Sequence, residues 1–287
     1  MKAIYKKEVK SYLTSMIGYV FIFFILLLEG IYFTAYNLQN AYPLFGTTLS
    51  AVTFIFLILV PVLTMKTIAE ERKQKTDQLL LTAPVSVSEI VLGKFLAVAT
   101  VYVIPVLIIC LYPMIMGKYG TVSYAMAYTA VLGFALLGFA QIAVGVFWSS
   151  VTENPVIAAV VTFIVLFVCY MITGIGSLIP DSSMASLACY MLLVLLAAVW
   201  IYHMIRNLWI AAVIGIAGEA VLVITYVVKS TLFEGSIQKF LAVFDITSHF
   251  DNFTNGILDL QGVVYFLSVI IIFLVLTVQT ITKRRWN

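Results

Sequence analysis

The chain has 287 residues, of which 63% are hydrophobic and only 10% are charged, and its formal net charge is +3. Soluble domains carry about 25% charged residues, and even a domain of about 300 residues leaves roughly a quarter of its unfolded-chain surface in water. The composition therefore excludes a soluble fold and predicts an all-α protein that crosses a lipid bilayer several times. Three scattered cysteines without CxxC spacing argue against a metal or disulfide framework.

The first predicted element is residues 1–14, in which basic and apolar side chains are interleaved. Lysines stand at positions 2, 6, 7 and 10, between Ile4, Tyr5, Val9, Tyr12 and Leu13. On a helix these residues can separate into a basic and an apolar face, which is typical of helices that lie in the headgroup region. The alternative is a basic flank that only orients the first span. The apolar run from Ile17 is too long for a cleavable signal and begins that span.

Eight stretches are apolar enough, over roughly 20 residues each, to cross a bilayer. They cover residues 17–36, 47–66, 95–116, 124–148, 155–178, 186–204, 208–228 and 262–282. Asn154 before Pro155 is typical of a helix start, and Pro61 and Pro105 predict bends in the second and third spans. Few residues around Arg206 separate the sixth span from the seventh, so a hairpin and one long interrupted helix are both open.

The basic residues predict the orientation of these spans. With eight spans, both termini lie on one side of the membrane, together with 13 of the 16 basic residues. These are Lys2, Lys6, Lys7, Lys10, Lys66, Arg72, Lys73, Lys75, Lys94, Arg206, Lys283, Arg284 and Arg285. The other side holds only Lys118, Lys229 and Lys239. Because cytoplasmic loops carry the excess of lysine and arginine, we expect both termini to be cytoplasmic and the protein to lie in the inner (plasma) membrane.

The predicted cytoplasmic loop of residues 67–92 combines a charged stretch with a short apolar run. It contains, in order, Glu70, Glu71, Arg72, Thr76, Leu79, Leu80, Leu81 and Pro84. This pattern predicts a short amphipathic helix that protrudes from the membrane. Three consecutive leucines need a surface to pack on, which is either the helix ends of this chain or another protein.

Two carboxylates and one glutamine inside the predicted spans are candidate functional residues. Glu29 and Glu219 are carboxylates at positions where a charged side chain costs about 2.5–3.5 kcal/mol on insertion scales. Each is a candidate for a polar contact in a substrate path or a dimer interface, and a structural carboxyl group between helices is the plainer interpretation. Gln141 lies near one face of the fourth span with Gly138 and Gly145, a pattern typical of packed helices, and is a further candidate for a pathway or interface residue.

Residues 233–260 form the predicted external segment before the last span. Their apolar side chains recur at spacings of three and four, at Phe240, Leu241 and Phe244 and again at Phe250, Phe253 and Ile257. This spacing predicts one or two short amphipathic helices at the outer membrane surface. His203 and His249 fall on opposite predicted sides of the membrane, so the sequence does not support a two-histidine metal site.

The loop of residues 67–92, together with Gly93 and Lys94, resembles the hallmark of ABC-2-type transporter permeases. That hallmark is similar to EE-x-x-x-G-T-x-E-L-L-L-x-x-P-V-S…G-K, although Lys75 and Gln78 stand where the family often has glycine and glutamate. In the family this segment is the coupling helix, which sits in a cleft of a separate ATP-hydrolysing subunit. The resemblance therefore implies an ABC ATPase partner at Glu70–Pro84.

The C-terminal segment is similar to one branch of this family. Its residues Ser248–Asp251, Asn255–Leu260, Tyr265 and Lys283–Trp286 resemble permeases associated with gliding motility and nitrous-oxide reductase maturation. The resemblance is weakest from about Ser182 to Phe244. Because family members commonly have six spans, the sixth and seventh spans here are interpreted as an inserted pair.

The resemblance implies a non-enzymatic permease, with residues 1–287 as one transmembrane domain that pairs with itself or with a similar permease. The sequence has no GxxxxGK[ST] phosphate loop, so ATP hydrolysis is expected on another chain. Export is the expected direction, with neither a cofactor nor a nucleic-acid partner, and the substrate is open. The alternatives are a membrane scaffold and an ion-coupled secondary transporter that uses Glu29 and Glu219. The absence of an inverted repeat argues against the secondary transporter.

Overall fold

The computed structural model describes residues 1–77 and 85–285, in which helices are joined by loops and turns and there is no strand. The contacts between Cα atoms divide the chain into two compact units. Unit 1 comprises residues 1–168 and 246–287, and unit 2 comprises residues 169–245. The all-α prediction is therefore confirmed for the described part of the chain.

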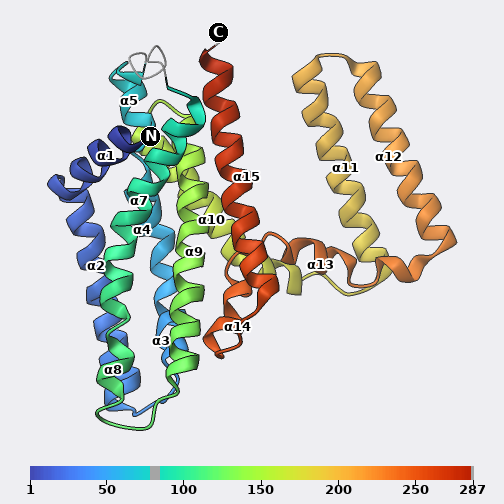
Figure 1. The fold of residues 1–287 in the computed structure, drawn as a ribbon. Coiled ribbons are helices and arrows are strands. Elements are labelled where there is room, and N and C mark those ends of the chain that lie inside the picture. The colour runs from blue at the N-terminus through green and yellow to red at the C-terminus, as the bar shows by residue number, and fades with distance from the viewer. Residues whose placement is uncertain (78–84, 286–287) are drawn as a thin grey trace. The chain divides into compact units, whose positions relative to one another are not determined.

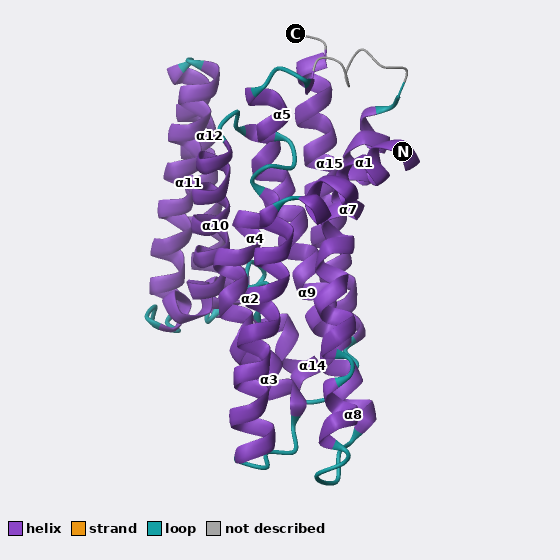
Figure 2. Ribbon diagram, turned by 90° about the vertical axis from the view of Figure 1, so that its left-hand side faces the viewer, coloured by secondary structure: helices purple, strands orange, loops and turns teal. Residues whose placement is uncertain are grey.

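Unit 1 is a bundle of long helices with short helices at both ends (Figures 1 and 2). Its elements are α1 (Lys2–Thr14), α2 (Met16–Tyr32) with a π-helical extension (Phe33–Gln39), α3 (Phe45–Val52), a 3₁₀ turn (Thr53–Ile55), α4 (Phe56–Thr64), α5 (Ala69–Lys73), α7 (Val87–Ile109), α8 (Tyr112–Met116), α9 (Tyr124–Val151), the first part of α10 (Pro155–Ser177), a 3₁₀ turn (Ser248–Phe250), α14 (Asp251–Thr254) and α15 (Leu260–Arg285). Both chain termini lie at one end of this bundle, close to α1 and α5 (Figure 1).

Unit 2 contains the last part of α10, two long helices and two short ones. These are α11 (Ser183–Ile205), α12 (Leu208–Val228), a 3₁₀ turn (Ser230–Phe233) and α13 (Ser236–Ala242). Arg206 ends α11 with a left-handed backbone conformation, at a φ of 53°. The sixth and seventh predicted spans are therefore two separate helices that form a hairpin (Figure 1).

The number of membrane-length helices agrees with the predicted total of about eight. Within the described ranges, seven helices are long and apolar enough to cross a membrane. An eighth span arises if α12 and the following 230–242 segment, bent by 116° relative to each other, are counted together. Helix α7 begins at Val87, eight residues before the predicted third span. Its start is fixed by a capping box, in which the Ser86 hydroxyl accepts from the Glu89 backbone N–H at 3.3 Å and the Glu89 carboxylate accepts from the Ser86 N–H at 3.3 Å.

Helix α9 is the central helix of unit 1 and packs against α3, α4, α7, α14 and α15. The phenol ring of Tyr102 on α7 is fully buried, covers Gly138 of α9, and donates its O–H to the Phe134 carbonyl at 2.7 Å. A side chain at Gly138 would collide with Tyr102, and a side chain at Gly145 would collide with Thr64. The face of α9 that carries these two glycines is therefore a packed helix interface, as predicted. Pro61 and Pro105 lie inside α4 and α7.

The predicted amphipathic segments are helical only in part. Within the predicted segment 1–14, Lys2–Thr14 form α1, whose buried side chains Ile4 and Tyr12 face α7 and α4. In the 233–260 segment, Phe240 and Phe244 are about half exposed, whereas Phe250 and Phe253 are fully buried in unit 1. Their rings lie 6.3 and 6.2 Å from those of Phe134 and Phe266. The periodicity alone did not reveal that this part of the segment belongs to the core.

Candidate functional site

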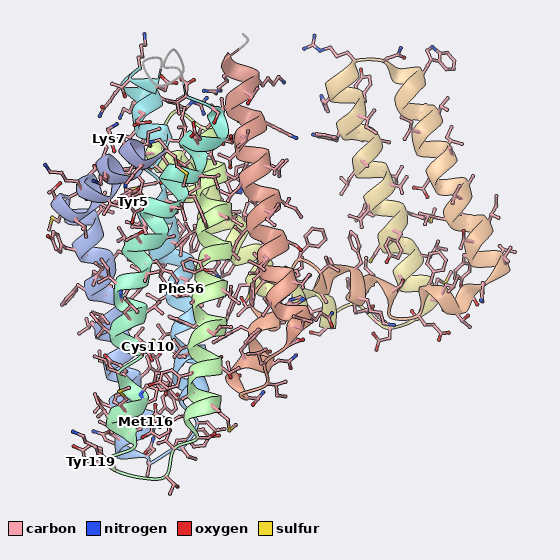
Figure 3. All side chains as sticks on the ribbon, in the orientation of Figure 1. Tyr5, Lys7, Phe56, Cys110, Met116 and Tyr119 are labelled. Carbon is pink, nitrogen blue, oxygen red and sulfur yellow. The ribbon has the colours of Figure 1, made fainter. Side chains whose placement is uncertain are left out.

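One end of unit 1 gathers α1, α5, the turn between α9 and α10, and the C-terminal end of α15. We call it the basic end, because Lys7, Lys66, Lys73 and Arg284 lie there. Lys7 and Tyr5 mark this end in Figure 3, and Met116 and Tyr119 mark the opposite end. The basic end carries the described part of the loop predicted to couple the chain to an ATPase.

Helix α5 is held at its first residues by a serine of α9. The Ser149 hydroxyl accepts from the backbone N–H groups of Ile68 and Ala69, both at 3.1 Å, and donates to the Met65 carbonyl at 3.1 Å. These N–H groups at a helix start have no partner within the helix, so the hydroxyl satisfies them from outside. The start of α5 is thereby attached to the end of α9.

A buried lysine joins α5 to α1 and α7. The Lys94 side chain of α7 is only 2% exposed, and its Nζ lies 3.0 Å from Glu8 Oε1 of α1 and 2.8 Å from Glu71 Oε2 of α5. Its third donor goes to the Thr67 carbonyl at 2.7 Å, so all three donors of the ammonium group are used. We call Lys94, Glu8, Glu71 and Lys7 the Lys94 cluster.

Lys7 closes this cluster toward solvent, with its Nζ 3.1 Å from Glu71 Oε1. Burial lowers the pKa of Lys7, but the hydrogen bond to Glu71 and the charges of Glu71 and Glu8 outweigh it, so this pKa lies above its usual value. Two ammonium groups and two carboxylates therefore balance one another. Tyr12 of α1 adds a neutral contact, because its O–H lies 3.0 Å from Thr67 Oγ1 and 3.2 Å from the Leu63 carbonyl.

Arg72 joins α5 to the C-terminal end of α9. Its side chain is 4% exposed, and Nη1 donates to the carbonyls of Ser150 and Thr152, the latter at 3.0 Å. A cation is favourable there, since the last carbonyls of a helix carry partial negative charge. Glu153 lies 3.8 Å from Arg72 Nη2 and 3.6 Å from Arg284 Nη1, which connects this end of α9 to α15.

The outer side of the segment remains exposed. Lys73, Gln74, Lys75 and Thr76 are exposed, and Glu70 is half exposed and pairs with Lys66 at 3.3 Å. A cavity of about 410 Å³ opens between α1 and this segment. The segment is thus anchored inward at Ala69 and Arg72 and exposed outward along Lys73–Thr76.

The structure separates the predicted coupling residues into two groups. Glu71 and Arg72 point inward as anchors, whereas Glu70 and Thr76 lie on the outer side. Leu79, Leu80, Leu81 and Pro84 lie outside the described residues. Sequence reasoning did not assign a role to Glu8 or Ser149. The signal for Glu8 was its position at i+4 from Ile4 and i−4 from Tyr12, which places a carboxylate on the apolar side of α1.

The comparison with protein families decides the class of this chain. The family profile described as "ABC-2 family transporter protein" matches residues 28–278. The chain belongs to the ABC-2 transporter family. It is therefore the membrane-spanning permease subunit of an ABC transporter and a multi-pass membrane protein, and the family implies an ABC ATPase partner. The comparison with curated proteins gave no match.

The backbone conformation at Lys75 shows why the family often has glycine at this position. Lys75 has a φ of 58°, the left-handed conformation that glycine adopts without steric cost, at the position where the family often has glycine. The Lys75 N–H donates to the Arg72 carbonyl at 3.0 Å and the Thr76 N–H donates to the Glu71 carbonyl at 2.9 Å. These bonds end α5 as a left-handed C-terminal cap does.

A Lys75→Gly variant is therefore expected to stabilise the end of α5. The left-handed conformation costs a non-glycine residue about 1–2 kcal/mol, and the extra chain entropy of glycine returns roughly 0.5–1 kcal/mol of this. Hydrogen exchange of the Thr76 amide should slow by about two- to fivefold. Lys73→Gly, inside the helix, should accelerate it instead, because glycine costs about 1 kcal/mol there. Equal exchange rates in both variants would contradict the left-handed cap.

The polar residues predicted inside spans occupy different places in the permease. Glu29 on α2 is 0% exposed and Gln141 on α9 is 2% exposed. Neither Glu29 oxygen, nor the Gln141 side-chain oxygen, has a hydrogen-bond partner among the described residues. Glu219 lies on α12 in unit 2, beside a groove between α11 and α12. The predicted pathway or interface role of the three residues stays a prediction.

Proposed function

We propose that the permease is an exporter subunit whose ATPase partner docks on the 67–92 segment at the basic end. The observation that supports this most is the division of the segment into an anchored inner side and an exposed outer side. Glu71 and Arg72 tie it to α1, α7 and α9, while Lys73–Thr76 are free to contact another protein. A segment that only connects two spans does not need so many buried charged contacts.

The same contacts support a route by which ATP-driven movement reaches the spans. Closure of the ATPase subunits would displace α5. Glu71 would carry this displacement through Lys94 to α7 and α1, and Arg72 would carry it to the end of α9. These residues are positioning residues for transport and do not touch the substrate. A dimer, formed by two copies or with a similar permease, would place the pathway between two such bundles.

The docking proposal predicts different defects for the two sides of the segment. Reversing the exposed charges, with Lys73→Glu and Lys75→Glu together, should reduce co-purification of the ATPase encoded nearest to this gene by at least about tenfold, or about 1.4 kcal/mol. Glu71→Gln should leave the ATPase bound and lower transport per ATP hydrolysed. Lys118→Glu, an exposed reversal in the loop between α8 and α9, is the matched control and should change neither.

Two outcomes would contradict this assignment. One is full ATPase binding by the Lys73→Glu/Lys75→Glu variant in lipid nanodiscs. The other is the absence of ATPase from the wild-type permease under the same conditions, which would remove the main support for ATP-driven transport.

The cytoplasmic placement of the basic end is tested by labelling. In a cysteine-free background, intact cells are treated with a membrane-impermeant maleimide. Tyr119→Cys, whose native side chain is 79% exposed at the opposite end, should react at once. Gln74→Cys, exposed at the basic end, should react only after the membrane is permeabilised. The reverse pattern would place the ATPase-docking segment outside the cell and contradict the proposed coupling.

A second candidate function is ion-coupled secondary transport, which is favoured by the fully buried carboxyl group of Glu29, for which the described part of the chain offers no hydrogen-bond partner. In that case transport would follow an ion gradient and ignore ATP, and Glu29→Gln would abolish it. Transport by Glu29→Gln at the wild-type rate would remove this alternative.

A further inference from the structure

The α11–α12 hairpin of unit 2 (Figure 1) carries a groove of about 560 Å³ along its two helices. The groove is lined by aliphatic residues and glycine, except for Tyr202 and Glu219. Both Glu219 oxygens are enclosed by the hairpin, so the surface that the groove presents is apolar. A ligand that lies along it must be apolar over the same length, because a polar group there would lose its hydrogen bonds to water.

The length of the groove corresponds to one leaflet of a bilayer. On α12 the lining residues run from Ala212 to Val223, which are eleven residues apart. At a rise of 1.5 Å per residue this distance is roughly 16 Å. The hydrocarbon core of a bilayer is about 30 Å thick, so each leaflet contributes about 15 Å of acyl chain. The groove is therefore as long as the acyl layer of a single leaflet.

One end of the groove lies beside the only charged residue of the hairpin turn. Tyr202 lines this end, and the Arg206 backbone N–H donates to its carbonyl at 2.8 Å. The Arg206 side chain is exposed, and Trp209 is 82% exposed. Tyrosine, tryptophan and arginine together are typical of the headgroup level of a membrane. Between residues 182 and 218 the sequence contains no aspartate or glutamate, so no acidic side chain of this stretch competes for Arg206.

We propose that this groove binds an anionic phospholipid of the cytoplasmic leaflet, with one acyl chain along the groove and the phosphate at Arg206. The proposal goes beyond the proposed function, because the lipid is a resident ligand of the hairpin and not the transported substrate. It does not depend on the ATPase partner.

A phospholipid matches both features of the site. An acyl chain needs only apolar contact along its length, which the groove supplies through many small dispersion contacts. A phosphate accepts strong charge-assisted hydrogen bonds from a guanidinium group, which Arg206 supplies at the headgroup level. The cytoplasmic leaflet is the one rich in anionic lipids, and the predicted orientation places the Arg206 turn on that side.

A transmembrane helix is a weaker fit for the same groove. Helices in a membrane associate through close approach of their backbones and through interhelical hydrogen bonds. Here Gly215 is already covered from within the hairpin, since an added Cβ would lie 3.1 Å from Ala198 Cβ. The rim carries Leu195 and Ile216, whose side chains are 53% and 70% exposed. A partner helix would find large side chains at the rim and no polar group with which to pair.

Quenching of tryptophan fluorescence by brominated lipid tests the proposal. The full-length permease is placed in phosphatidylcholine vesicles with a minor fraction of phosphatidylglycerol whose acyl chains are dibrominated. The reporter is Tyr202→Trp with the native tryptophans replaced by phenylalanine, and the control protein keeps Trp200 alone. Trp200 is 67% exposed and lies about 200° around α11 from Tyr202, outside the groove.

The Tyr202→Trp reporter should show an apparent affinity for the brominated phosphatidylglycerol about fivefold above that of the Trp200 control, the factor expected of one basic residue near anionic lipid. Equal quenching of the two proteins would indicate unselective contact with the bilayer and overturn the proposal. No quenching of the Tyr202→Trp reporter would mean that protein covers the groove, from this chain or from another copy, and would overturn it as well.

The phosphate contact is tested by Arg206→Asn in the Tyr202→Trp background. Arg206 has a φ of 53°, and asparagine tolerates this left-handed conformation, so the turn is kept while the charge is lost. The affinity for brominated phosphatidylglycerol should fall about fivefold, to that for brominated phosphatidylcholine. Lys229→Gln, which removes an exposed cation at the other end of α12, should leave it unchanged. An equal loss in both variants, or in neither, would contradict a phosphate site at Arg206.

The acyl-chain contact is tested by filling the groove. Ala220→Phe places a ring in the groove, whereas Ala197→Phe places the same ring on the opposite side of α11, and both alanines are exposed. Ala220→Phe should abolish the preferential quenching of the Tyr202→Trp reporter, and Ala197→Phe should retain it. Retention in both variants, or loss in both, would show that the acyl chain does not lie in this groove.

Discussion

Replacing Lys94 with methionine is expected to lower the free energy of unfolding of the permease by about 3–5 kcal/mol, because it leaves buried carboxylates without their partner. Lys94 Nζ lies 3.0 Å from Glu8 Oε1 and 2.8 Å from Glu71 Oε2, and both carboxylates are largely shielded from water. Methionine fills a similar volume, so the loss is one of charge and hydrogen bonds. Thermal or denaturant unfolding in detergent micelles measures the change.

Two further variants make the Lys94→Met result specific. Lys73→Met, an exposed position on α5, should change stability by less than about 0.5 kcal/mol. Adding Glu8→Gln to Lys94→Met should recover part of the loss, because it removes the carboxylate that has lost its nearest cation. If Lys94→Met were as stable as Lys73→Met, the Lys94 cluster would have to be well hydrated, and its role as an anchor of α5 would fail.

Replacing Gly46 with alanine is expected to destabilise unit 1 by about 3 kcal/mol. Gly46 lies in the first turn of α3, where an added Cβ would collide with the Thr254 carbonyl oxygen and lie 2.6 Å from Thr254 Cα. The colliding atoms are backbone atoms of α14, so no side-chain rotation can relieve the overlap, and α3 and α14 must separate. Overpacking of this kind costs about 1–3 kcal/mol and occasionally more.

The control for Gly46→Ala is Gly174→Ala on α10, where an added Cβ meets no protein atom within 4 Å. That substitution should be neutral or stabilising by up to about 1 kcal/mol, since alanine favours the helix. The two alanine variants are compared by their melting temperatures in the same detergent. Opposite signs are expected, and equal shifts would contradict the close contact between α3 and α14.

Hydropathy was sufficient to locate the helices that can cross a membrane. The predicted seventh span, 208–228, has the bounds of α12, and the predicted fourth and fifth spans begin at the first residues of α9 and α10. Span prediction succeeds because a membrane helix satisfies its backbone groups within its own segment, so its position depends on local composition. The prediction was less accurate for α7, which begins at Val87, before the predicted third span. Its first turns after Ser86 include polar residues, so hydropathy did not mark them as helical.

Sequence motifs were sufficient for the family but not for the geometry of the site. The Glu70–Glu71–Arg72 run and Gly93–Lys94 indicated an ABC-2 permease, and the match over residues 28–278 confirmed it. From the motif, we expected Glu71 and Arg72 to belong to the ATPase-docking surface. In the structure both bind residues of this chain that are distant in sequence, Lys94 and Thr152. Lys94 and Glu8 are 86 residues apart, and Arg72 and Ser150 are 78 residues apart.

The sequence by itself thus determined the membrane class, the positions of the spans and the family, since composition and short motifs are local properties. Only the tertiary structure decided which side of the 67–77 segment is buried, that Phe250 and Phe253 belong to the core, and that Glu8 pairs with Lys94. The physical reason is the same in each case. A charged or aromatic side chain becomes an anchor or a core residue only when a helix from a distant part of the sequence packs against it and removes it from water.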